Sequence, residues 1–147
     1  MQIPRPVHPF PARMAASIPW RVLRAHSENG PLRVLDPMVG SGTTAVVARS
    51  LGHKAIGFDK DPLAILIANA WCADVDESYV FGKAREVLVR AEQLQVTQRD
   101  AYPRGANSEV KKFVRYWFDP RNRQELVALS RCIERVRDDV TRTLLWC

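Results

Sequence analysis

An α/β fold of the Rossmann-like, doubly wound type is expected for this 147-residue chain. Short apolar runs at residues 33–35 and 54–58 alternate with helix-forming stretches, and the turns between them are short. A glycine turn, Gly40-Ser41-Gly42, follows the first run and leads directly into a helix. This order of strand, helix, strand and helix is typical of a parallel sheet.

The first half of the chain supplies the elements of that sheet. Residues 1–12 are rich in proline and predict an extended arm. The expected elements are, in order, a helix at 15–25, a turn at 28–31, a strand at 33–35, a helix at 43–51, a strand at 54–58 and a helix from about 61 to 73. Gly52 closes the second helix, and Pro62 suits the first turn of the third.

The second half predicts helices and no third or fourth strand. We expect helices at 81–95 and 109–118, a loop at 100–108, and one long amphipathic helix from Arg123 to the end. A doubly wound sheet of two strands is incomplete, so we expect this chain to be the front part of a longer protein. Residues 1–80 would form the cofactor-binding half, and residues 81–147 a basic helical extension.

Composition limits the class of protein and the kind of partner. The net charge is +6, and residues 81–147 hold 14 Lys and Arg against 9 Asp and Glu. A basic surplus favours a polyanion such as DNA as a partner of this half, although a solvated helix face is the simpler interpretation. No secretory signal, membrane span or metal-binding spacing is present in the sequence, and the three separate cysteines indicate reduced thiols in a cytoplasmic protein.

Two aspartates mark the expected ligand pocket. Asp36 follows the first strand and Asp59 ends the second, so both lie where the carboxyl ends of parallel strands meet. Residues 40–45 fit a dinucleotide-binding pattern, but the carboxylate of Asp36 would repel a pyrophosphate. A Walker phosphate loop is excluded because no lysine follows the second glycine.

S-adenosylmethionine suits this acidic pocket better, since it carries an ammonium and a sulfonium and no phosphate. Asp59 is placed to accept the two ribose hydroxyls, and Asp36 would lie near the cationic methionine end. The alternative interpretation is structural: Asp36 caps the following turn and Asp59 caps the third helix.

The segment from Val34 to Thr44, which reads VLDPMVGSGTT, closely resembles the cofactor motif of N6-adenine and N4-cytosine DNA methyltransferases. The upstream segment from His8 to Met14 resembles the His-Pro segment of that family, and residues 57–62 resemble its second motif. The resemblance covers residues 8–73. It implies a methyltransferase-type fold and a set of cofactor-binding residues: His8, Pro9, Phe10, Asp36, Pro37, Met38, Gly40, Ser41, Gly42, Thr43, Asp59 and Lys60.

The sequence departs from this family at the catalytic motif. The family's Asp/Asn/Ser-Pro-Pro-aromatic tetrapeptide is missing, since the chain contains no Pro-Pro, and residues 119–122 are a poor match. Because this motif holds the target amine and stacks on the flipped base, we name no catalytic residue and expect the motif beyond residue 147. The resemblance implies methyl transfer to an exocyclic amine of adenine or cytosine.

Other functions remain open from the sequence alone. They are a non-catalytic module that binds S-adenosylmethionine or a partner subunit, an RNA methyltransferase, and, least favoured, a nicotinamide-dependent enzyme. The C-terminal helix could pack on a missing part of the sheet or on a partner. Phe113, Tyr116, Trp117 and Phe118, among lysines and arginines, could stack on bases, although an aromatic stripe on a helix is more often core.

Overall fold

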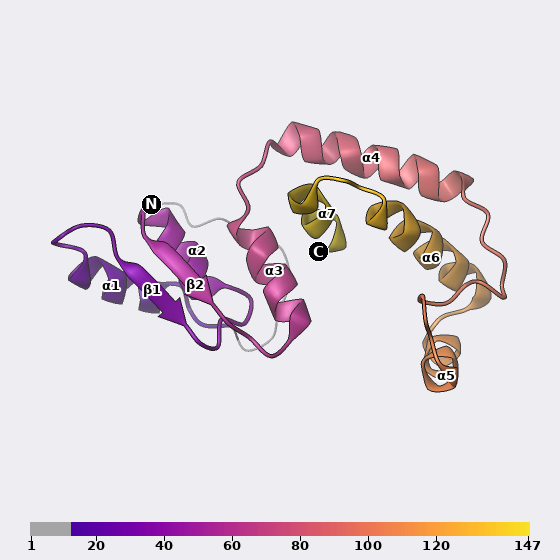
Figure 1. Cartoon of the computed structure of the whole chain (residues 1–147), viewed down its shortest axis with the longest axis horizontal. Coiled ribbons are helices and arrows are strands. Elements are labelled where there is room, and N and C mark those ends of the chain that lie inside the picture. The colour runs from indigo at the N-terminus through magenta and orange to yellow at the C-terminus, as the bar shows by residue number, and fades with distance from the viewer. Residues whose placement is uncertain (1–12) are drawn as a thin grey trace. The chain divides into compact units, whose positions relative to one another are not determined.

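The computed structural model describes residues 13–147, which form seven helices and a two-stranded parallel sheet (Figure 1). The proline-rich arm and the predicted cofactor residues His8, Pro9 and Phe10 lie outside the described residues. The described chain divides into two compact units, one of residues 13–74 with 146–147 and one of residues 75–145. None of the helices within residues 13–147 is long and apolar enough to cross a membrane.

The first unit contains the predicted strand and helix alternation. Its elements are α1 (Ser17–His26), β1 (Arg33–Asp36), α2 (Thr43–Ser50), β2 (Lys54–Gly57) and α3 (Pro62–Cys72). The two strands are parallel, and their register pairs Arg33 with Lys54 and Asp36 with Gly57. The predicted order is therefore confirmed, with boundaries that differ by one or two residues.

Helix α2 is the centre of this unit, because it contacts both strands as well as α1 and α3. Val47 and Ala48 on α2 are fully buried. They pack with Leu23 of α1, and Trp20 and Val34 surround this core. Burial of these side chains fixes α2 against one face of the strand pair.

The opposite face of the strand pair is open in the described part of the chain. Leu35 and Ile56, which are paired in register, are 64% and 56% exposed. A doubly wound sheet carries helices on both faces, whereas the face of this strand pair that holds Leu35 and Ile56 is exposed within residues 13–147. The observed fold is a parallel βαβα unit joined to helices.

The second unit is helical throughout its described length. Its helices are α4 (Glu77–Gln93), α5 (Ser108–Trp117), α6 (Pro120–Glu134) and α7 (Asp139–Trp146). Helices α4 and α6 run side by side (Figure 1). Val87 of α4 packs with Cys132 and Ile133 of α6, and a second small core joins Val96 and Ala101 to α6.

The expectation of one long C-terminal helix is wrong. The chain leaves the helix after Glu134 and begins α7 at Asp139. Asp138 lies before α7, and its carboxylate accepts a hydrogen bond of 2.8 Å from the backbone N–H of Thr141. The apolar spacing continued across the break because Val136, between the two helices, packs on the same small core. Helix α4 also begins earlier than predicted, since Asp76 caps it.

The aromatic stripe of α5 is not core. No residue of α5 is buried, and Phe113, Tyr116 and Trp117 are 60%, 80% and 63% exposed. These rings contact one another, with centroids 6.2 Å apart for Phe113 and Trp117 and 5.2 Å apart for Tyr116 and Trp117. The interpretation of the stripe as core is therefore wrong for the described residues.

Candidate functional site

The carboxyl ends of β1 and β2 bring Asp36 and Asp59 to one edge of the sheet. The N–H of Phe58 donates to the carbonyl of Asp36 at 2.9 Å, which continues the strand pairing beyond Gly57. The N–H of Val39 then donates to the carbonyl of Phe58, also at 2.9 Å. The turn after β1 is thus joined by its backbone to the turn after β2.

Asp59 links the two turns through its side chain. One carboxylate oxygen accepts from the N–H of Gly40 at 2.8 Å, and the other accepts from the N–H of Asp61 at 2.9 Å. The N–H groups of Asp61 and then Gly40 hold the pKa of Asp59 below its usual 3.8. The group is therefore charged at neutral pH. Each oxygen still has capacity for a further donor.

Asp36 has a local partner as well. Its carboxylate accepts a 3.1 Å hydrogen bond from the N–H of Met38, so it does cap the turn that follows β1. The helix-capping interpretation of Asp59 is wrong, because Asp61 caps α3 by accepting from the N–H of Leu63 at 2.9 Å. Capping of α3 by Asp61 leaves Asp59 pointing toward the glycine turn.

The glycine turn depends on conformations and space that only glycine provides. Gly40 and Gly42 have φ angles of 51° and 93°. A Cβ on Gly42 would lie 2.9 Å from both the Cα and the Cβ of Ala68 on α3. The close approach of α3 to this turn therefore requires glycine at position 42.

Two packing residues escaped the sequence reasoning. A Cβ on Gly57 would lie 2.6 Å from the side chain of Val39, so Val39 fills the space that glycine leaves at the end of β2. Glycine inside a strand commonly marks such a close approach, and this signal was present in the sequence. Val39 is 6% exposed and anchors the turn between Asp36 and Gly40.

The remaining predicted residues divide into buried and exposed groups. Ser41 and Thr43 are buried, at 4% and 5% exposure, where the turn enters α2. Pro37, Met38 and Lys60 are exposed. Helix α2 begins without a side-chain cap, so its first N–H groups are available to an anionic or polar group. The edge combines carboxylates, backbone donors and apolar surface.

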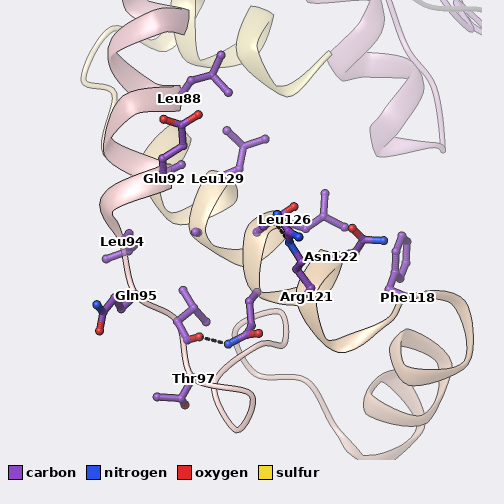
Figure 2. Close-up of a pocket in the computed structure, with 15 residues that line it drawn as sticks. Leu88, Glu92, Leu94, Gln95, Thr97, Phe118, Arg121, Asn122, Leu126 and Leu129 are labelled. Carbon is purple, nitrogen blue, oxygen red and sulfur yellow. Dashed lines mark hydrogen bonds and ion pairs between the residues drawn. The ribbon is translucent and has the colours of Figure 1, made fainter.

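A separate hollow of about 1090 Å³ lies between α4 and α6, in the second unit (Figure 2). Leu88 and Glu92 of α4 and Leu126 and Leu129 of α6 line it, and the amide of Gln124 donates to the carbonyl of Val96 beside it. None of the predicted cofactor residues that fall within residues 13–147 lines this hollow.

Comparisons with known proteins match the part of the chain that carries this site. Residues 3–70 match the profile of a DNA methylase family. The type II methyltransferase M2.DpnII of Streptococcus pneumoniae is 46% identical over 48 residues, which are 33% of this chain and 18% of that protein. No solved structure matches the chain.

Two further type II methyltransferases are similar. M.MjaII of Methanocaldococcus jannaschii is 29% identical over 83 residues, or 56% of this chain and 15% of the relative. M2.LlaDCHI of Lactococcus lactis subsp. cremoris is 57% identical over 35 residues, or 24% and 13%. The matched stretches span less than a fifth of each relative's length. Residues 3–70, which are less than half of this chain, are therefore similar to the N6- and N4-amino DNA methyltransferase family.

Proposed function

We propose that residues 1–80 are the S-adenosylmethionine-binding half of a DNA amino-methyltransferase, to which residues 81–147 add a basic helical extension. The observation that carries this proposal is the linked pair of strand ends, in which Asp59 reaches across to Gly40. The family match and the type II methyltransferase relatives support DNA as the substrate.

The residues present fit S-adenosylmethionine. The charged carboxylate of Asp59 is fixed by two backbone N–H groups and retains lone pairs for the ribose hydroxyls. The positive φ angles of Gly40 and Gly42 bring the backbone, without side chains, next to Asp36 and Asp59. A pyrophosphate would meet both carboxylates, which disfavours a dinucleotide.

In this proposal each group has one task. Asp59 would hold the ribose, and Asp36 would attract the cationic methionine end. The uncapped start of α2 would offer N–H groups to the methionine carboxylate. His8, Pro9 and Phe10, with Pro37, Met38, Ser41, Thr43 and Lys60, would complete the surroundings of the cofactor. The bound cofactor supplies an electrophilic methyl group for transfer to an exocyclic amine.

The methyl transfer itself requires groups that this sequence lacks. An exocyclic amine of adenine or cytosine is a weak nucleophile, because its lone pair is delocalised into the ring. The Pro-Pro-aromatic motif that positions such an amine in this family is missing from the 147 residues. In this proposal, no residue of these 147 is assigned the choice between adenine N6 and cytosine N4.

Isothermal titration with S-adenosylhomocysteine tests the proposal. We expect saturable binding by the chain, and at least about tenfold weaker binding by Asp59→Ala, because a charge-assisted hydrogen-bond acceptor is lost. Asp74→Ala is the control, since this exposed aspartate pairs with Arg49 and lies beyond α3. Binding of NAD in place of S-adenosylhomocysteine, or unchanged affinity in Asp59→Ala, would overturn the assignment.

The missing catalytic motif also favours a second candidate, a module that binds S-adenosylmethionine without catalysis. The sequence of the full gene separates the two. A Ser/Asn/Asp-Pro-Pro-aromatic motif encoded after residue 147 supports the enzyme, and a gene that encodes no such motif supports the binding module.

A further inference from the structure

Five cationic side chains of the second unit gather around Tyr102. Lys111 and Arg123 approach the ring, with Nζ 5.7 Å and Cζ 5.2 Å from its centroid. Tyr102 also lines a hollow of about 170 Å³ together with Arg104, Arg131 and Glu134. An adjoining hollow of about 620 Å³ is lined by Arg104, Arg131, Glu134 and Arg135. We call these five cations and Tyr102 the Tyr102 cluster.

The acidic groups near the cluster are too few to neutralise it. Glu134 is the one carboxylate residue among those that line the two hollows, and it lies 3.8 Å from Arg104. The backbone carbonyl of Asp100 accepts from Arg131 at 3.2 Å, while the carboxylate of Asp100 accepts from Thr97. Arg135 is exposed and has no ion-pair partner within residues 13–147.

Arg123 carries a buried charge that the described residues do not compensate. It is 8% exposed, and one guanidinium N–H donates to the hydroxyl of Tyr102 at 2.8 Å. Its Nε has no hydrogen-bond partner in residues 13–147, and no carboxylate there lies within 4.0 Å of the guanidinium. A buried cation without a counterion is costly unless an anion is supplied from outside.

The wider charge distribution points the same way. Residues 99–137 hold 10 Lys and Arg against 5 Asp and Glu, a surplus of 5 in a chain of net charge +6. Guanidinium groups bind phosphate oxygens through pairs of N–H donors. Three guanidinium groups, those of Arg104, Arg131 and Arg135, line the larger hollow, and this arrangement suits several phosphates in a row.

We propose that the Tyr102 cluster contacts the phosphate backbone of duplex DNA, at a surface separate from the cofactor residues. The proposal rests on the proposed function for its choice of DNA among polyanions. Arg104, Arg131 and Arg135, which line the hollows, bind the phosphates. Arg123 and Lys111, which lie over the ring of Tyr102, add to the positive potential of this surface.

Fluorescence anisotropy of a labelled duplex of about 20 base pairs tests this surface, with the full 147-residue chain and a range of salt concentrations. The variant Arg104→Gln/Arg131→Gln/Arg135→Gln is expected to bind at least about tenfold more weakly at low salt. The slope of log affinity against log salt should fall by about 2 to 3, since each lost phosphate contact contributes about 0.9.

The control is Arg21→Gln/Arg85→Gln/Arg90→Gln, which removes the same charge from exposed positions of α1 and α4. We expect it to change affinity by less than about twofold to threefold and to keep the salt slope. Equal weakening in both triple variants, or no weakening in the cluster variant, would overturn the proposal. If the cluster variant does not fold by circular dichroism, Arg135→Gln alone should weaken binding and lower the slope by about 1.

Titration with inorganic phosphate tests whether the cluster binds the DNA backbone or only a small free anion. If phosphate binds the wild-type chain and not the cluster variant, while both bind duplex DNA equally, the cluster is a site for a small anion only and the proposal fails. Titration with S-adenosylhomocysteine separates this failure from that of the proposed function, because the cluster variant should keep wild-type affinity for it. If the cluster variant binds duplex DNA as tightly as the wild-type chain, while both bind S-adenosylhomocysteine, the cluster proposal fails and the proposed function stands.

Discussion

At the scale of single residues, the glycine turn shows why position matters more than residue type. Gly42 and Gly52 both have positive φ angles, 93° and 76°. Gly42 faces the backbone of α3, whereas a Cβ on Gly52 would meet nothing within 4 Å. The two glycines therefore share a left-handed backbone conformation that would strain an alanine, but they differ in the space around them.

Gly42→Ala should destabilise the chain by about 2–4 kcal/mol, because left-handed strain adds to a clash with Ala68. Gly52→Ala is the matched control and should cost only the strain, about 1–2 kcal/mol. Urea unfolding followed by circular dichroism measures both. Equal losses in the two variants would contradict the close approach of α3 to the turn.

The same scale shows what sequence reasoning could reach. The aspartates, the glycines and their order along the chain placed the edge where the two strands end, because parallel strands must bring these positions together. Individual side-chain hydrogen bonds could not be predicted from the sequence. The link from Asp59 to Gly40 accompanies two further local contacts, the hydrogen bond from the N–H of Asp61 to Asp59 and the close fit of Val39 against Gly57.

At the scale of elements, β1 separates two environments along one strand. Val34 packs against the core around α2, and its neighbour Leu35 points to the open face, because side chains alternate along a strand. Neither residue type nor strand propensity distinguishes the two positions. The difference lies in which face α2 covers.

Val34→Thr should therefore cost about 1–2 kcal/mol, since a hydroxyl enters an apolar environment. Leu35→Thr should change the free energy of unfolding by no more than about 0.5 kcal/mol, because threonine keeps the strand preference and the side chain is already exposed. Thermal unfolding of both variants makes the comparison. A larger loss at Leu35 than at Val34 would show that the open face is covered in solution.

Elements also mark where the sequence pattern misled. The apolar residues from Leu126 to Leu144 have the spacing of one helix, but the helix is interrupted at residues 135–138. Helical spacing reports which side chains share a core, and Val136 shares it from outside a helix. The turn chemistry of Asp138 was the signal for the break, and the apolar periodicity masked it.

At the scale of the whole molecule, the two halves differ in what can be inferred from sequence. The first unit carries a family motif and a fold pattern that constrain each other. The second unit has helices whose packing partners the sequence did not identify. The Tyr102 cluster could not be predicted from sequence, because it combines residues of the loop at 94–107 with residues of α6. Tyr102 and Arg123 are 21 residues apart in the chain.

The 147-residue chain should bind cofactor without methylating DNA. Incubation with duplex DNA and a methyl-labelled donor is expected to give no labelled base above background, because the sequence holds no Pro-Pro-aromatic motif. Labelled adenine or cytosine in that assay would require a different catalytic constellation within these residues. A DNA methyltransferase that contains the motif is the positive control.

The face of the strand pair that is exposed within residues 13–147 also affects how this chain behaves in concentrated solution. Leu35 and Ile56 form a short exposed apolar ridge on adjoining strands. Such ridges adhere to their own copies, so concentrated preparations will tend to cluster unless the ridge is shielded. Leu35→Lys would hinder that adhesion by charge repulsion and would alter none of the proposed cofactor residues, which makes it a practical starting point for handling the isolated chain.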